Sequence, residues 1–184
     1  MQELSLNILD LAQNSIAAGA TLIEIGVEED TGADTLILTI RDNGRGMSKN
    51  QLDAVTDPFY TTRTTRKVGL GVPFFKMAAE QSGGHLEISS TPGEGTSVRG
   101  VFGLSNIDRM PLGDLNGTIE TLIYCNPQLD FVYSRSRDGE SFTLDTREVR
   151  AVLSGVPLNA NEVTLWLKEF LCEGEQQVNG DYSV

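Results

Sequence analysis

The stretch Asp42-Asn43-Gly44-Arg45-Gly46 is the most informative segment of this chain. It follows an apolar run, Leu36 to Ile40, whose composition predicts a β-strand. Asp42 is an acceptor-only carboxylate at the end of that strand, where it could accept the exocyclic amine of adenine, a contact that guanine does not offer. Gly44 and Gly46 carry no side chains, so a flat base could lie against the backbone. Alone, Asp-Asn-Gly is usually a turn, so the interpretation depends on the flanking motifs.

Upstream of this segment, residues 3–18 have the apolar spacing of a helix, which Gly19 ends. Asp10 and Asn14 lie one turn apart on the same side of that helix. The amide oxygen of Asn14 suits a Mg²⁺ ion that is held mainly by phosphates and water. The carboxylate of Asp10 could polarise an attacking hydroxyl or water, which is the role of a catalytic base.

Downstream, a second helix is expected over residues 70–82. Gly69-Leu70-Gly71 stands at its start, where glycines let backbone N–H groups and the positive helix end meet phosphates. Arg63, Arg66 and Lys67 add cations just before this motif, and Lys67 is the candidate for a phosphate contact. These residues predict the phosphate end of a nucleotide site.

Further strands are expected on both sides of the Asp42–Gly46 segment. The turn Gly93-Glu94-Gly95-Thr96 joins two expected strands, Leu86 to Ser90 and Ser97 to Leu104. Earlier, Leu22 to Val27 and Leu36 to Ile40 read as a hairpin. This order of elements predicts an α+β domain.

Composition excludes several classes of partner. With 14 Lys and Arg against 26 Asp and Glu, the net charge is −12, which repels nucleic-acid phosphates. No stretch approaches the roughly 18 apolar residues that would cross a membrane, and the start Met1-Gln2-Glu3 is no secretory leader. Cys125 and Cys172 form no metal-ligand or redox spacing. We therefore expect a cytoplasmic protein that binds neither nucleic acid nor membrane.

Residues 105–184 carry no motif that indicates a chemistry. Beyond a boundary near 105–112, the pattern predicts a helix to about Tyr124, strands at 131–135 and 141–144 joined by an Asp138-Gly139 turn, a helix capped by Asp145 or Thr146 and ending at Leu153, and a last helix through Trp166 to Cys172. We expect the final ten residues to be disordered, and Phe131, Tyr133 and Trp166 to belong to the core. This segment is the natural place for a partner or homodimer contact.

Taken together, residues 1–104 resemble the GHKL ATPase superfamily, which includes gyrase, the heat-shock chaperone ATPase, histidine kinases and MutL. The matching motifs are an N box at 10–20, a first glycine box at 42–46, a proline-phenylalanine segment of histidine kinases at 57–60, a second glycine box at 69–71, and closing strands around 83–96. The resemblance implies a two-layer α/β sandwich with a mixed, mostly antiparallel sheet, helices on one face and a mobile lid over ATP and Mg²⁺. Here a small C-terminal α/β extension, 105–184, would follow.

The resemblance also assigns roles to single residues. They are Asp42 for adenine, with Thr96 supporting it through water; Gly44 and Gly46 against the adenine ring; Gly69, Leu70, Gly71 and Lys67 at the phosphates; Asn14 at Mg²⁺; and Asp10 as the catalytic base.

Two points stay open in this assignment. Glu3 and Asn7 have the same spacing as the N-box pair, but Asp10 and Asn14 are preferred because Gly19 and the next strand then follow at the family's distance. Asp10 also replaces the glutamate of the hydrolysing members. A carboxylate withdrawn by about 1 Å can cost roughly 100-fold in rate, so we expect slow hydrolysis.

The leading expectation is a stand-alone ATP-binding protein of histidine-kinase type that transfers phosphate to another protein, as small bacterial anti-sigma-factor kinases do. The alternatives are a nucleotide-gated binding module and a slow ATPase. His85, the only histidine, is expected at a strand start on the surface and not as the phosphoacceptor. The whole chain is also similar to small proteins of anaerobic bacteria encoded near NADH-linked iron hydrogenases, so the expected partner is a regulator or a redox enzyme.

Overall fold

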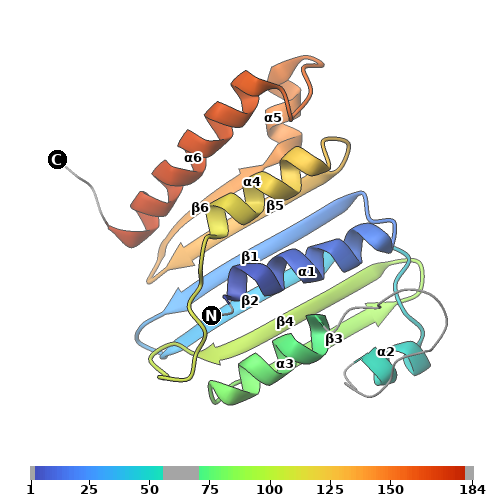
Figure 1. Cartoon of the computed structure of the whole chain (residues 1–184), viewed down its shortest axis with the longest axis vertical. Helices are drawn as coiled ribbons and strands as arrows, with labels where there is room; N and C mark the ends of the chain where they lie inside the picture. The colour runs from blue at the N-terminus through green and yellow to red at the C-terminus, as the bar shows by residue number, and fades with distance from the viewer. Residues whose placement is uncertain (1–2, 56–70, 181–184) are drawn as a thin grey trace.

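A single six-stranded sheet forms the centre of the computed structural model, which describes residues 3–55 and 71–180 (Figure 1). The strand order is β3-β4-β2-β1-β5-β6, and every neighbouring pair is antiparallel except β1 and β5. The strands are β1 (Leu22–Asp30), β2 (Thr35–Asp42), β3 (His85–Thr91), β4 (Gly95–Gly103), β5 (Asp130–Arg137) and β6 (Glu140–Asp145). The predicted mixed, mostly antiparallel sheet is confirmed.

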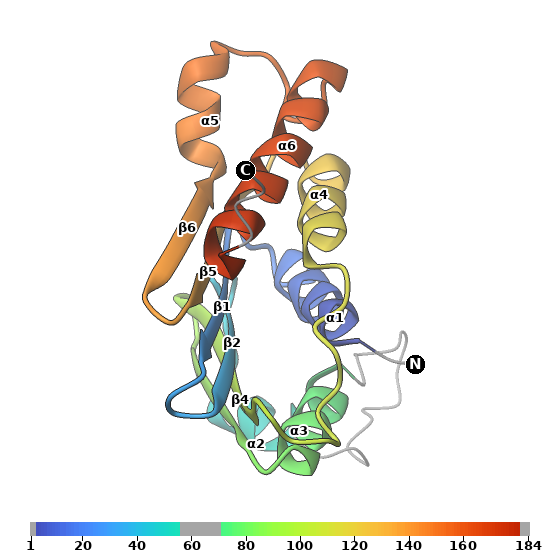
Figure 2. The same ribbon diagram turned by 90° about the vertical axis from the view of Figure 1, so that its left-hand side faces the viewer.

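Four helices cover one face of this sheet, as Figure 2 shows with the sheet seen from its edge. They are α1 (Leu4–Ala17), α3 (Gly71–Gln81), α4 (Leu115–Cys125) and α6 (Asn161–Asn179). Two short helices follow strand ends: α2 (Lys49–Val55) comes after β2, and α5 (Thr146–Leu153) comes directly after β6. The predicted two-layer α/β sandwich with helices on one face is therefore confirmed.

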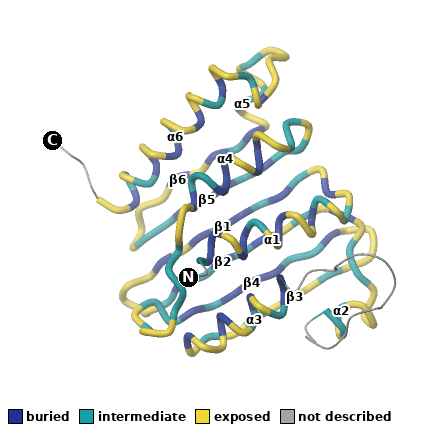
Figure 3. The backbone as a smooth tube through the Cα atoms, viewed as in Figure 1, coloured by how far each residue is buried: buried dark blue, intermediate teal, exposed yellow. Residues whose placement is uncertain are grey.

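Alternating burial explains why the sheet has one covered face. Along β1, Ile23, Ile25 and Val27 are buried, while the residues between them are partly exposed. Such alternation is typical of an antiparallel sheet that packs on one side only. Figure 3 shows the same division along the helices, whose buried positions recur at helical spacing.

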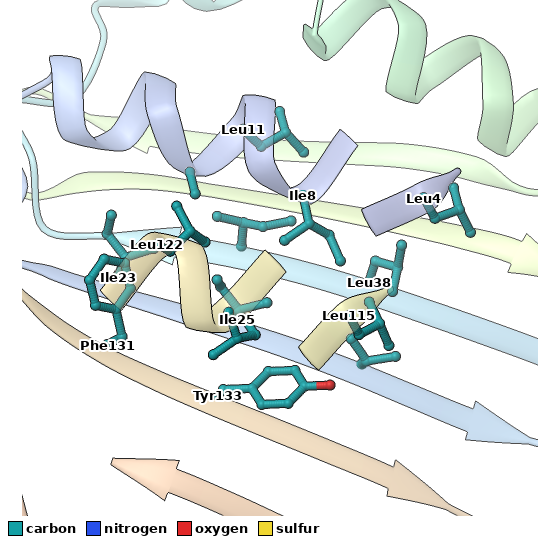
Figure 4. Close-up of a cluster of buried hydrophobic side chains, with 14 of the residues drawn as sticks. Leu4, Ile8, Leu11, Ile23, Ile25, Leu38, Leu115, Leu122, Phe131 and Tyr133 are labelled. Carbon is teal, nitrogen blue, oxygen red and sulfur yellow. The ribbon is translucent and has the colours of Figure 1, made fainter. Parts of the chain in front are cut away.

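The core lies between α1, α4 and the central strands (Figure 4). Its labelled members come from five elements: Leu4, Ile8 and Leu11 from α1, Ile23 and Ile25 from β1, Leu38 from β2, Leu115 and Leu122 from α4, and Phe131 and Tyr133 from β5. Both the sheet and this core continue past residue 105. The division into 1–104 and 105–184 stays a prediction.

The C-terminal helix is longer than the sequence predicted. It continues to Asn179, so the expectation of disorder over the final ten residues is wrong for 175–179. The physical reason is tertiary contact: Val178 is buried, and Oε2 of Glu175 lies 3.7 Å from Nε of Arg135. These contacts hold a polar sequence in a helix that its composition alone does not favour.

The prediction that Trp166 belongs to the core is also wrong, because 44% of its surface is exposed. Helix α6 buries Val163, Leu167 and Leu171 instead, and Trp166 stacks on Phe170 with ring centroids 5.1 Å apart. Phe131 and Tyr133 lie in the core as predicted.

A charged cluster lies under α6. Arg135 is 2% exposed, and its Nη2 donates to Oε1 of the buried Glu29 at 3.2 Å. Arg137, which is half-buried, also reaches Glu29, with 3.5 Å between Nε and Oε2. Within the described ranges, the buried hydroxyl of Tyr133 has no hydrogen-bond partner. No helix in the same ranges is long and apolar enough to cross a bilayer.

Candidate functional site

The C-terminal end of α1, the end of β2 and the start of α3 lie toward the same edge of the molecule (Figure 1). Asp42 is the last residue of β2. Ser15 on α1 donates its hydroxyl to Oδ2 of Asp42 at 2.6 Å, and the N–H of Gly44 donates to Oδ1 at 2.8 Å. Each carboxylate oxygen is thus oriented by a protein donor and keeps a lone pair for a ligand.

Gly46 in the loop after β2 and Gly95 in the β3–β4 turn are required by the packing of the chain itself. Gly46 has φ +64°, and a Cβ there would overlap the carbonyl oxygen of Thr91. Gly95 has φ +117°, and a Cβ there would overlap the carbonyl oxygen of Asp42. The loop after β2 therefore packs against the β3–β4 turn without side chains between them. The predicted contact of Gly44 and Gly46 with a base stays a prediction.

Asn43 anchors this loop to the start of β1. Its Oδ1 accepts the N–H groups of Thr21 and Leu22, each at 2.9 Å, and its Nδ2 donates to Oγ1 of Thr21 at 2.9 Å. The sequence did not single out this residue, because an asparagine beside a glycine is read as a turn residue. The anchor fixes the backbone that follows Asp42.

Thr96 lies directly opposite Asp42 in the β2–β4 pairing. Its Oγ1 is 2.9 Å from the hydroxyl of Ser90, which also accepts the N–H of Met47 at 2.8 Å. Ser90 was missed as well, since a serine near a strand end carries no distinguishing signal. The strand pairing brings together Asp42 and Thr96, the two residues expected at adenine. We call the part of the site formed by these two residues the base end.

At the other end of the site, α3 begins at Gly71 against α1. A Cβ at Gly71 would lie 3.3 Å from Cβ of Asp10 and 3.8 Å from Nδ2 of Asn14. Asp10 and Asn14 are both exposed on this side of α1. Gly71, the last residue of the second glycine box, is thus adjacent to the predicted N-box pair. Gly69, Leu70, Lys67, Arg63 and Arg66 lie outside the described residues.

The competing pair, Glu3 and Asn7, lies toward the opposite end of α1. Glu3 lies against Gly113, in the segment whose carbonyls accept the first N–H groups of the helix. At 1.5 Å per residue, Glu3 is about 18 Å along the helix from Ser15, the residue that binds Asp42. Asn7 is 8% exposed, and its Oδ1 has no hydrogen-bond partner within the described part of the chain. This placement favours Asp10 and Asn14 as the functional pair.

His85 begins β3 and is exposed, as predicted. Its Nε2 is 3.1 Å from Oε1 of Glu87, and hydrogen bonds from His85 and then Arg99 lower the pKa of that glutamate. Five residues of strand, about 16 Å, separate His85 from Ser90 at the base end of the site.

Across residues 3–55 and 71–180, no group of three or more His, Cys, Asp or Glu side chains is placed to hold a metal ion. The Mg²⁺ expected at Asn14 is of a different kind, because it would take most of its oxygen ligands from nucleotide phosphates and water. One amide oxygen is enough for that role.

The sequence matches one family of ATPases and is similar to parts of several sensor kinases. The model of the family described as "Histidine kinase-, DNA gyrase B-, and HSP90-like ATPase" matches residues 1–106. The sensor histidine kinase ZraS of Salmonella typhimurium is 35% identical over 89 residues, which cover 48% of this chain and 19% of ZraS. The sensor protein kinase GraS of Staphylococcus aureus is 35% identical over 94 residues, covering 48% of this chain and 27% of GraS.

This chain therefore spans less than a third of the length of either kinase. Among solved structures, the N-terminal domain of a DNA repair protein superimposes with a TM-score of 0.53 at 14% identity, covering 79% of this chain and 53% of the other. That likeness concerns the fold alone.

Proposed function

The chain belongs to the histidine kinase-, DNA gyrase B- and HSP90-like ATPase family, and from that premise we propose that it binds ATP with Mg²⁺ and transfers the γ-phosphate to a partner protein in trans. The observation that carries the proposal is that one stretch of α1 contacts both ends of the site. Ser15 binds Asp42 at the base end, and Asn14 lies beside Gly71 at the start of α3.

Each side chain has a task in this proposal. The carboxylate of Asp42 accepts the exocyclic amine of adenine, with Thr96 beside it. Asn14 would hold the Mg²⁺ of the nucleotide, which would neutralise phosphate charge, and the N-terminal end of α3 would stabilise the same charge. The acceptor group attacks phosphorus, its proton passes to Asp10, and the bond to the bridging oxygen of ADP breaks.

The position of His85 supports a partner in trans. His85 is exposed at the far end of β3 from the base site, so it is poorly placed to meet the γ-phosphate within the roughly 3–3.5 Å that transfer requires. Residues 105–184 are the candidate region for recognising a regulator or redox enzyme, or for a homodimer. The free thiols of Cys125 and Cys172 are in keeping with a reducing cytoplasm.

A nucleotide-gated binding module is the second candidate, favoured by one observation. Position 10 carries an aspartate, whose carboxylate reaches one methylene less far than a glutamate would from the same helix position. If that shortening removes turnover, ATP would only order the site and switch a partner. A slow ATPase is the intermediate case.

Calorimetry tests the binding part of the proposal. The full chain should bind ATP in the presence of Mg²⁺ and discriminate against GTP. Asp42→Asn should lose about 1–3 kcal/mol of binding free energy, because the amide presents a donor where the amine needs an acceptor. Unchanged ATP affinity in this variant would remove the assignment of Asp42.

Transfer is tested with γ-labelled ATP and fractionated protein from the source organism. We expect label on a second polypeptide, no label on the chain itself, and loss of transfer in Asp10→Asn with ATP affinity largely retained. Label on the chain that disappears in His85→Ala would show an autokinase instead. ATP binding without labelled protein or free phosphate would leave the gated module as the function.

A further inference from the structure

The hydroxyl of Ser90 is the centre of three short contacts next to the base end of the site. It accepts the N–H of Met47 at 2.8 Å, donates to the carbonyl oxygen of Gly95 at 2.9 Å, and lies 2.9 Å from Oγ1 of Thr96. Ser90 and Thr96 are opposite one another in the β3–β4 pairing. These contacts link the loop after β2, the β3–β4 turn and Thr96 through one side chain.

The number of hydroxyl protons determines which of Ser90 and Thr96 donates to the other. Ser90 has one hydroxyl proton, and the carbonyl oxygen of Gly95 can only accept. All three contacts are hydrogen bonds only if Ser90 donates to Gly95 and Thr96 donates to Ser90. In the reverse arrangement, the contact between Ser90 and Gly95 would bring two oxygens together without a proton between them. The proton of Thr96 is therefore committed to Ser90, and Thr96 presents only lone pairs to a ligand.

We infer that Ser90 is a positioning residue that sets nucleotide specificity by holding Thr96 as an acceptor. The inference rests on the proposed function, since it concerns the base that the site takes. It goes beyond that function because it assigns a role to Ser90, to which the resemblance gives none, and a polarity to Thr96.

The consequence follows from the chemistry of the base edge. Asp42, opposite Thr96 in the sheet, is also acceptor-only. Two adjacent acceptors suit the 6-amino group of adenine, which has two N–H donors, one for Asp42 and one for Thr96 directly or through water. Inosine has a carbonyl oxygen at that position, and an acceptor facing two acceptors gains no hydrogen bond.

The test compares ATP with ITP, inosine triphosphate, by calorimetry on the full chain with Mg²⁺. The wild type should prefer ATP. In Ser90→Ala, the hydroxyl of Thr96 can rotate and donate to the carbonyl of ITP, so the ratio of ATP to ITP affinity should fall about 2- to 10-fold, the range of one neutral hydrogen bond. Ser89→Ala is the matched control, because Ser89 is the exposed neighbour on β3 and its loss should keep the wild-type ratio.

The affinity ratio separates positioning from a purely structural role. Ser90→Ala also leaves Met47 and Gly95 without their partner, and a loosened loop would weaken ATP and ITP by the same factor. Thr96→Val serves as a second variant if Ser90→Ala fails to fold. It removes the hydroxyl at constant shape, and it should weaken ATP while leaving ITP unchanged.

Three outcomes would overturn the inference. An unchanged ratio in Ser90→Ala is the first. A Thr96→Val variant that weakens ITP as much as or more than ATP is the second, since Thr96 would then not act as an acceptor selective for the amine of adenine. The third is a wild type that does not bind ATP, which refutes the proposed function and the inference with it. The first two leave ATP binding by the wild type intact, so the two failures are distinguishable.

Discussion

Ser15 and Asp42 are joined by a hydrogen bond of 2.6 Å between Oγ and Oδ2, although 27 positions separate them in the sequence. Ser15 is 4% exposed on the sheet side of α1. The bond ties the helix that carries Asp10 and Asn14 to the strand that carries the candidate adenine acceptor. The two ends of the site are therefore held in a fixed relation by α1.

Ser15→Ala should weaken ATP binding about 3- to 30-fold, because Asp42 loses the donor that orients one of its oxygens. The measurement is calorimetric titration of ATP with Mg²⁺. Ser5→Ala is the control: Ser5 is 2% exposed on the same helix, and its hydroxyl bonds to Glu3 at the other end. Equal ATP affinity in the two variants would mean that Ser15 does not support the site.

The N-box register can be tested by the effect of Mg²⁺. In the wild type, Mg²⁺ should raise the affinity for ATP, and Asn14→Ala should lose most of that gain because the amide oxygen no longer binds the ion. Asn7→Ala should keep it, even if removing a buried side chain lowers stability. ATP titrations with Mg²⁺ and with EDTA give the comparison. The reverse result would assign Mg²⁺ binding to Asn7 and the role of catalytic base to Glu3.

Two arginines that contact the buried Glu29 under α6 should contribute unequally to stability. Arg135→Met should lower the free energy of unfolding by about 3–5 kcal/mol, because Glu29 is left buried with its main partner gone. Arg137→Met, which removes the half-exposed partner of the same carboxylate, should cost only about 0–1 kcal/mol. Urea denaturation of the two variants measures both values. Similar losses would mean that burial does not distinguish the two arginines.

Much of the fold could be predicted because local pattern and tertiary structure agree. Gly19 ends α1 with φ +78°, and Asp138 and Gly139 both have positive φ in the β5–β6 turn, as their residue types predict. The C-terminal end of α6 could not be predicted in this way. Its helix depends on Val178 and on the contact of Glu175 with Arg135, 40 positions earlier, which no local pattern contains.

The same difference between local patterns and long-range contacts applies to the candidate site. Asp42 and Gly71 were identified from short motifs with a chemical rationale, and the structure brings Gly71 next to Asp10 and Asn14. Ser15 and Ser90 were not identified, because a serine has no distinguishing signal until the fold places its hydroxyl against a partner. Their contacts span 27 and 43 positions, to Asp42 and Met47 respectively. Long-range hydrogen bonds of single hydroxyls are the part of a site that sequence patterns do not carry.

Tyr133 makes the free energy of unfolding depend on pH in the alkaline range. Burial, followed by the nearby charge of Glu175, raises the pKa of its phenol far above the usual value. A raised folded-state pKa favours the protonated form, so its contribution is complete below the unfolded pKa of about 10 and is lost as pH rises above it. The wild type should therefore lose stability between about pH 10 and 11.5, the window above the unfolded pKa that is accessible to measurement.

Tyr133→Phe should flatten that loss, because position 133 then has no phenol that is protonated in the folded chain and ionises in the unfolded one. Near pH 8 the variant should be at least as stable as the wild type, since the hydroxyl it removes is buried with no partner among residues 3–55 and 71–180. Urea midpoints at several pH values measure the slope. Tyr124→Phe, at an exposed position, should keep the wild-type slope. If Tyr133→Phe and Tyr124→Phe lose stability in parallel above pH 10, another group controls the alkaline transition.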